Sequence, residues 1–178
     1  MNIEIVKVGE LRCNCYLISN GGKVLVIDPG DDSDKIIDKI GDRKVVGIII
    51  THHHFDHDGA VSEIVSKYGC KAYDRYNLSE GENKISDFNF SVIYTPGHKE
   101  DLITIYFDKE KWMFCGDFIF KDTIGRCDLP GSNLLDMKKS IDKIKKYDRD
   151  ITLYPGHGDK TSLGYEMDNN IYFRASFW

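Results

Sequence analysis

The positions of six histidines constrain this chain more than any other feature. Four of them fall in the stretch THHHFDHDGA at residues 51–60, directly after the β-branched run VVGIII, which predicts a buried strand. The other two, His98 and His157, each follow an apolar run and the dipeptide Pro-Gly, and Asp117 closes a further apolar run, KWMFCG. Glycine lets a chain turn sharply at a strand end and approach a ligand closely. We therefore expect four strand ends to carry metal-binding side chains to one edge of the fold.

The spacing inside the histidine stretch indicates which of its side chains can bind a metal together. In an extended chain alternate side chains lie on the same face, so His52 and His54 point together while His53 points elsewhere. Asp56 and His57 follow after one residue. Imidazoles and a carboxylate in one short loop form the mixture of ligands that zinc and related metals favour. A helical H-E-x-x-H zinc motif fits less well, because a histidine and not a glutamate follows His53.

The rest of the pattern predicts an α/β fold in two halves, each with strands first and helices after them. Strands are expected at IEIVKV, CYLIS and KVLVID and over 45–51, 90–95, 102–107, 111–115 and 151–154. Helices are expected over 31–40, 60–69 and 132–146. Two sheets that face each other, with helices on the outer faces, would bury these apolar patterns. A length of 178 residues favours a single domain over 1–178.

Composition argues against several classes of protein. The net charge of −5 does not favour a nucleic-acid partner, and the basic run at 138–146 fits the solvated side of a helix. No apolar run could span a bilayer and the N-terminus lacks a signal-peptide pattern, so we expect no membrane contact and a cytoplasmic protein. The five cysteines are odd in number and form no C-x-x-C pair, which predicts reduced core cysteines, Cys115 included.

The order of the motifs resembles the metal-binding signature of the metallo-β-lactamase fold superfamily. T-H-x-H-x-D-H, P-G-H, G-D and P-G-H-G occur in this order between residues 51 and 157. The resemblance implies a four-layer αβ/βα sandwich with two mixed β-sheets. It also implies two divalent metal ions, with zinc expected and iron or manganese compatible. The implied ligands are His52, His54 and His98 for the first metal, Asp56, His57 and His157 for the second, and Asp117 as a bridge. His53 is expected to pack or to meet solvent.

Two longer segments, at 116–132 and 155–170, resemble short glyoxalase II-like hydrolases. Glyoxalase II cleaves hydroxyacyl thioesters of glutathione, so the resemblance implies a hydrolase of S-lactoylglutathione or other small acyl thioesters. We expect the helical glutathione-binding domain of glyoxalase II to be absent from this chain. The family commonly has small residues after the P-G-H motif, where this chain has Lys99, Glu100 and Asp101. β-Lactamases of this fold usually have cysteine at the position of Asp117, which argues against antibiotic hydrolysis.

The predicted ligands indicate a mechanism. Two cations about 3.5–4 Å apart can share one water and lower its pKa toward neutrality. The bridging hydroxide would attack a carbonyl that one metal polarises, with Asp56 as the catalytic residue that orients it. A thiolate leaves readily, so a thioester needs little general-acid assistance. Arg126 and Tyr172 are candidate substrate contacts, for which an ion pair and a half-buried aromatic ring are the alternative interpretations.

Three other functions remain as alternatives. A persulfide dioxygenase shares the fold and a similar G-R-x-D segment but uses a single iron. A metal-dependent nuclease is disfavoured by the negative net charge and by the lack of an added RNA-binding segment. A non-catalytic metal-binding protein would usually have lost a ligand, and none is missing here.

Overall fold

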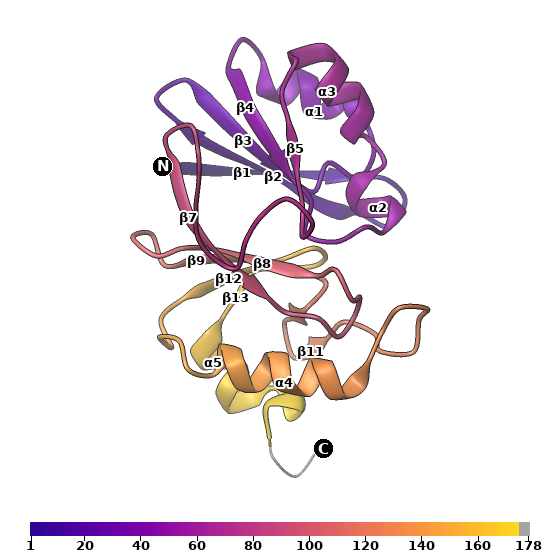
Figure 1. Cartoon of the computed structure of the whole chain (residues 1–178), viewed down its shortest axis with the longest axis vertical. Coiled ribbons are helices and arrows are strands. Elements are labelled where there is room, and N and C mark those ends of the chain that lie inside the picture. Colours follow the sequence, from indigo (N-terminus) through magenta and orange to yellow (C-terminus); the bar gives the residue numbers. More distant parts are fainter. Residues whose placement is uncertain (175–178) are drawn as a thin grey trace.

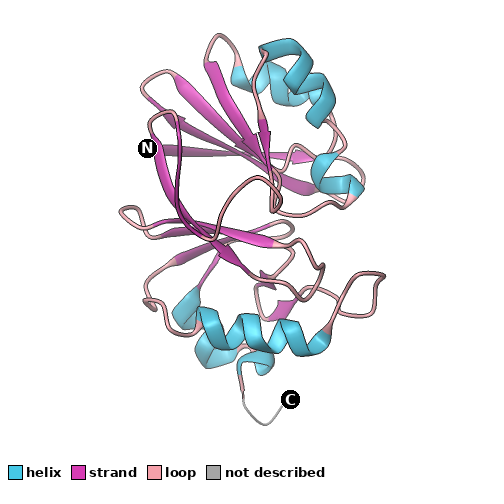
Figure 2. Cartoon of the chain, viewed as in Figure 1, coloured by secondary structure: helices cyan, strands magenta, loops and turns pink. Residues whose placement is uncertain are grey.

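Two β-sheets face each other, and helices cover the outer side of each sheet (Figure 1; Figure 2). This computed structural model describes residues 1–174, so the last four residues of the predicted domain, 175–178, lie outside the described part. Both sheets are mixed, because each contains parallel and antiparallel neighbours. The predicted αβ/βα sandwich is therefore confirmed.

The first sheet has the strand order β1-β2-β3-β4-β5. Its strands are β1 (Asn2–Val8), β2 (Cys13–Asn20), β3 (Lys23–Ile27), β4 (Lys44–Ile49) and β5 (Ala72–Tyr73). The helices of this half are α1 (Ser33–Ile40), the single turn α2 (Phe55–Asp58) and α3 (Val61–Tyr68). Buried isoleucines of α1 and α3 pack with the valines of β3 on the outer face of the sheet. The turn at Gly21-Gly22 joins β2 to β3, and both glycines have the positive φ that a two-residue hairpin turn favours.

The second sheet has the strand order β13-β12-β9-β8-β7-β6. Its strands are β6 (Gly81–Ile85), β7 (Phe88–Tyr94), β8 (Ile103–Phe107), β9 (Trp112–Gly116), β12 (Thr152–Pro155) and β13 (Thr161–Ser162). A separate hairpin pairs β10 (Ile119–Phe120) with β11 (Thr123–Ile124). The outer side carries α4 (Leu134–Ile144), α5 (Leu163–Asn169) and the 3-10 turn η1 (Ile171–Phe173). Within residues 1–174 no helix has both the length and the apolarity needed to cross a membrane.

Aromatic side chains fill the space between the sheets and hold the two halves together. The ring of Tyr16 on β2 lies edge-on to the rings of Phe114 and Tyr154, which belong to the second sheet. Its hydroxyl donates a 2.6 Å hydrogen bond to the carbonyl of Pro155, which also accepts a bond from Asn14 Nδ2. A strand of the first sheet is thus bonded to the end of β12, two residues before the predicted ligand His157.

The predicted elements agree with the structure where the apolar periodicity is long. The helix predicted over 132–146 is α4, whose N-cap Asn133 accepts a hydrogen bond from the backbone of Asp136. The helix predicted over 60–69 is α3, and Gly69 closes it in the left-handed conformation. The pattern missed the short or half-exposed elements, which are β5, β6, β10, β11, β13, α2 and α5. The buried thiol of Cys115 lies among core residues, as predicted.

Replacing Tyr16 with phenylalanine tests the junction between the sheets. We expect the free energy of unfolding to fall by about 1 kcal/mol, because one buried hydrogen bond is lost while Pro155 keeps its bond from Asn14. Urea unfolding of the purified protein measures this change. Tyr76→Phe is the matched control, since the Tyr76 side chain is 73% exposed. Equal midpoints for Tyr16→Phe and the unmodified protein would show that this bond does not stabilise the fold.

Candidate metal centre

Loops at one edge of the two sheets bring the predicted ligands together. Three loops follow strands β7, β9 and β12 of the second sheet, and one segment follows β4 of the first sheet and includes α2. Each strand is buried, so its last residue fixes the position of the polar side chain that follows. The residues brought to this edge are His52, His54, Asp56 and His57 from the first half and His98, Asp117 and His157 from the second.

Three imidazoles form the first group. The Nδ1 atom of His54 lies 3.0 Å from Nε2 of His52 and 3.1 Å from Nε2 of His98. Two nitrogens that bind one zinc ion at about 2.0–2.1 Å with tetrahedral angles lie about 3.3 Å apart. The spacing of the three nitrogens therefore fits a single small cation between them.

The partners of the second ring nitrogen, Nδ1, in His52 and His98 show which nitrogen of each ring carries the lone pair. His98 Nδ1 lies 2.8 Å from the carbonyl oxygen of Arg126, so it carries the proton. Thr51 Oγ1 donates to Asp28 and lies 3.1 Å from His52 Nδ1, so it accepts the proton of that nitrogen. The Nε2 atoms of His52 and His98 therefore both direct lone pairs at His54. Because such lone pairs repel each other, this arrangement fits a bound cation.

The second group combines imidazoles with carboxylates. Nε2 of His157 lies 3.1 Å from Oδ2 of Asp56, and Nε2 of His57 lies 3.2 Å from Oδ1 of Asp117. The other oxygen of Asp117, Oδ2, lies 3.6 Å from Nε2 of His98 in the first group. Asp117 Oδ1 is buried and accepts no hydrogen bond in the described structure. The two oxygens of Asp117 thus face the two groups separately, which is the arrangement a bridging ligand requires.

Burial and neighbouring charges set the protonation of the cluster without metal. Burial, together with the imidazoles of His57 and His98, holds the pKa of His52 well below its ordinary value. Burial alone would also lower the pKa of His57, but the carboxylates of Asp28 and Asp117 raise it well above its ordinary value. Burial alone would raise the pKa of Asp117, yet His57 and the other imidazoles hold it low. His52 therefore offers a lone pair directly, while a cation at the second group would replace the proton of His57.

Asp28 was missed by the sequence analysis. Its Oδ2 lies 3.0 Å from Nδ1 of His57, and both of its oxygens accept bonds from Thr51. A carboxylate on Nδ1 fixes the orientation of the ring and turns Nε2 toward the cluster. The sequence does contain a signal for this residue. Asp28 directly follows the apolar run VLVI of β3, at the edge where the other strands end.

His53 points away from the cluster, as the alternation predicts, and its half-buried side chain has several partners. Its Nδ1 lies 2.8 Å from Asp58 in α2, and its Nε2 lies 3.3 Å from Asp74 after β5. Its backbone N–H donates to Asp101, and its ring stacks on Tyr76. His53 therefore ties the segment with His52 and His54 to three other segments. Asp101 is only 3% exposed, so it supports this loop from inside and is not a charge at the entrance.

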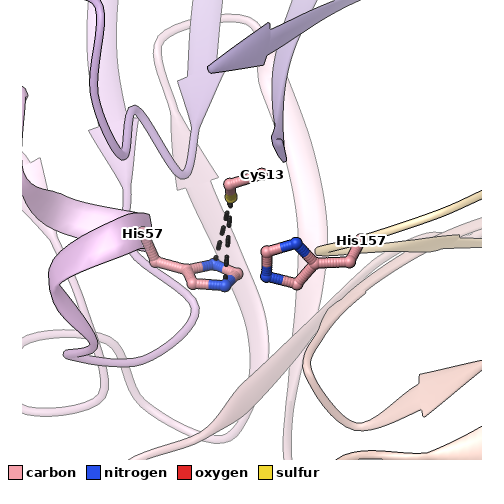
Figure 3. A group of neighbouring side chains, drawn as sticks. All are labelled: Cys13, His57 and His157. Atoms are coloured by element: carbon pink, nitrogen blue, oxygen red, sulfur yellow. Dashed lines mark hydrogen bonds between the residues drawn. The ribbon is translucent and has the colours of Figure 1, made fainter. Parts of the chain in front are cut away.

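Cys13 lies beside the second group, as Figure 3 shows. Its sulfur is 3.7 Å from Nδ1 and 3.9 Å from Nε2 of His57. Nearly equal distances to both nitrogens place the sulfur beside the ring and off the line of the Nε2 lone pair. Burial raises the pKa of this thiol to about 11, so it stays protonated. Cys13 is accordingly a packing partner of His57, in agreement with the predicted core cysteine.

Gly156 permits the close approach of β12 to the second group. A Cβ atom at this position would lie 2.3 Å from Oδ1 of Asp117 and 2.5 Å from Cε1 of His57. Both distances are below van der Waals contact, so any side chain would displace two predicted ligands. The glycine of the P-G-H motif is therefore required by space at this site.

The two candidate substrate contacts have structural partners. Arg126 forms a bidentate ion pair with Asp128, at 2.9 and 3.0 Å, on the exposed surface. Tyr172 is half-buried against the core between the second sheet and its helices. Both alternative interpretations thus describe these side chains, and contact of either with a substrate stays a prediction.

Comparison with known proteins places this geometry in a family. The model of the metallo-beta-lactamase superfamily matches residues 8–79 and 74–157. An uncharacterized protein of Aquifex aeolicus (strain VF5) is 32% identical over 97% of both chains. Hydroxyacylglutathione hydrolase GloC of Haemophilus influenzae is 29% identical, over 98% of this chain and 99% of the relative.

Several solved structures also resemble this chain in fold. The B3 metallo-beta-lactamase BLEG-1 superposes with a TM-score of 0.93 at 28% identity, over 98% of this chain and 100% of the other. The di-iron-bound form of TTHA1623 has a TM-score of 0.87 at 28% identity, covering 95% and 99%. ETHE1 from Myxococcus xanthus has a TM-score of 0.88 at 23% identity, covering 96% and 84%, and at that identity it shows the fold alone.

The two groups of donors predict two metal ions per chain. Elemental analysis of the purified protein is expected to give two equivalents of a divalent metal, and Asp117→Ala is expected to lower both, because its oxygens face both groups. One equivalent that does not rise after incubation with zinc would contradict a dinuclear site.

Asp28→Asn tests the support of the second group. Loss of the carboxylate beside His57 is expected to weaken metal binding by about 10- to 100-fold, as for other groups that orient a metal ligand. Competition with a chelator of known affinity measures the change. Asp31→Asn is the matched control, because Asp31 is an exposed acid three residues further along the same loop. Equal affinities for both variants would show that Asp28 does not act on the metal.

Proposed function

Because this chain belongs to the metallo-beta-lactamase superfamily, we propose that it is a metal-dependent thioester hydrolase of the glyoxalase II type. Its substrates are S-lactoylglutathione or other small acyl thioesters, and its cofactors are two divalent metal ions. The observation that carries the proposal is the arrangement around Asp117, whose two oxygens face two separate groups of donors. A complete pair of sites is what hydrolysis by two metals requires.

The residues at the edge suit the departure of a thiolate. Two divalent cations held there would lower the pKa of a water molecule and polarise a carbonyl oxygen. The partial burial of Asp56 alone would raise its pKa, but His157 and His57 hold that pKa below its ordinary value. An ionised Asp56 can orient a water molecule and accept its proton, but it cannot protonate a leaving group. A thiolate needs no such proton, whereas an amine does, so these residues favour thioesters over amides.

Relatives support the same substrate class. GloC is named as a hydroxyacylglutathione hydrolase, and its likeness to this chain extends over nearly the full length of both. The di-iron form of TTHA1623 supports iron beside zinc as a metal for the site. The negative net charge supports a small-molecule substrate over a nucleic acid.

A persulfide dioxygenase is the second candidate. The segment Gly125-Arg126-Cys127-Asp128 favours it, since that class has a similar G-R-x-D segment, and ETHE1 shares the fold. The side chains of the second group favour the hydrolase, because a single iron would leave them without a role. Anaerobic purification distinguishes the two: one iron with oxygen uptake on glutathione persulfide supports the dioxygenase, and two metals with thioester cleavage support the hydrolase.

Asp56→Asn is the sharpest test of the chemistry. We expect kcat for a thioester substrate to fall by at least about 100-fold, because the variant loses the carboxylate that orients the attacking water. Asp34→Asn, an exposed acid on α1, is the matched control. Metal content is measured in parallel, so that loss of metal and loss of orientation are separated. Unchanged kcat in Asp56→Asn with two metals bound would remove Asp56 from the mechanism.

A substrate panel tests the proposal as a whole. The panel contains S-lactoylglutathione, an acyl thioester without the glutathione peptide, a β-lactam and glutathione persulfide. We expect cleavage of both thioesters by the zinc-loaded protein. Cleavage of the β-lactam with kcat/KM above both thioesters would contradict the proposal, and would agree with the likeness to BLEG-1.

A further inference from the structure

Three apolar residues border the pair formed by Asp56 and His157. Phe55 is 76% exposed and directly precedes Asp56, and Leu11 is 54% exposed in the turn between β1 and β2. Phe120, on β10, has its ring centroid 6.2 Å from that of His157. We call Leu11, Phe55 and Phe120 the apolar rim. These residues come from three distant parts of the sequence, and each borders a residue of the second donor group.

Backbone contacts hold the segment that carries each member of the rim. The carbonyl oxygen of Leu11 lies 3.1 Å from Nδ1 of His157 and accepts its proton. Phe55 opens α2, where its own carbonyl accepts the N–H of Gly59. The hairpin with Phe120 is tied to α5, because the buried Glu166 accepts a 3.0 Å bond from the backbone of Asp122. The rim is therefore attached to rigid parts of the structure.

Two charged residues near the centre are not members of the rim. Lys99 directly follows His98, a histidine of the first donor group. Arg126 forms an ion pair with Asp128. Leu11, Phe55 and Phe120 thus offer apolar surface beside the second group, and small-molecule sites typically combine apolar side chains with a few polar groups.

We propose that the apolar rim binds the apolar chain of the substrate, so that the enzyme acts on thioesters of aliphatic or aromatic acids in preference to the hydroxyacyl thioester S-lactoylglutathione. This inference rests on the proposed thioesterase function. Leu11 and Phe55 are then specificity-determining residues, because they would contact the acyl chain while the metal-binding residues act on its carbonyl group. Closing the rim over such a chain would remove apolar surface of both partners from water.

A series of acyl thioesters that share one simple thiol tests the proposal. A methylene group that becomes fully buried corresponds to about fourfold in binding, so we expect kcat/KM to rise by about two- to fourfold per methylene from acetyl to hexanoyl. Leu11→Ala and Phe55→Ala should flatten this rise, so that kcat/KM falls more for the hexanoyl thioester than for the acetyl thioester. Ile5→Ala is the matched control, because Ile5 is a 45% exposed aliphatic residue in the middle of β1, away from the centre.

Binding to the metal-free protein gives a second measurement that does not depend on catalysis. Titration calorimetry with hexyl and methyl thioethers of the same thiol is expected to show tighter binding of the hexyl compound, and Phe55→Ala should remove the difference. Equal kcat/KM across the series, or a rise that Leu11→Ala and Phe55→Ala leave unchanged, would overturn the inference while leaving a thioesterase in place. Failure of the metal-loaded protein to cleave any thioester would instead overturn the proposed function. A dimer that Phe55→Ala converts to monomers would also overturn the inference, since a second copy would then cover the rim.

Discussion

The mutual repulsion of donor atoms at one edge is the constraint on which the rest of this structure depends. Nitrogens of His52, His54 and His98 meet at 3.0–3.1 Å, and the buried carboxylate of Asp117 lies beside them, with Oδ2 3.6 Å from His98. Such a cluster is unfavourable without a cation, so packing elsewhere must hold it in place. Two sheets with long buried strands provide that packing, because each strand end is fixed before the chain turns into the cluster.

The junction between the sheets also holds the donor cluster in place, through contacts close to the cluster. The carbonyl of Pro155 accepts bonds from Tyr16 and Asn14, and the next residue, Gly156, leaves no space for a side chain beside Asp117 and His57. Asp28 and His53 act from the other side, by orienting His57 and by joining the histidine segment to α2. The donors are thus positioned by neutral bonds and by carboxylates that do not themselves face the metal positions.

Patterns along the sequence predicted the elements whose apolar residues form a long run or a regular alternation. Long apolar runs gave β4, β7, β9 and β12, and the alternation in an extended segment separated His53 from its neighbours. Two-residue strands such as β5 and β10 have no period to detect, and their pairing is decided by tertiary contacts. Asp101 stands where the family commonly has a small residue, and it is buried, where it accepts the backbone N–H of His53. The side chains that support the site from behind come from distant segments, which no local pattern connects.

The division of the donors between the two halves has a consequence for the biosynthesis of the protein. His57 and His157 are 100 residues apart in the chain, since 157 − 57 = 100, yet they belong to one donor group. At roughly 5–20 residues per second, a ribosome needs roughly 5–20 s to add the segment between them. During that interval the nascent chain has Asp56 and His57 but not His157, so a cation could meet only an incomplete second group. Filling of the second group would therefore be a late event that follows the docking of β12, whereas the first group is complete once His98 has been added.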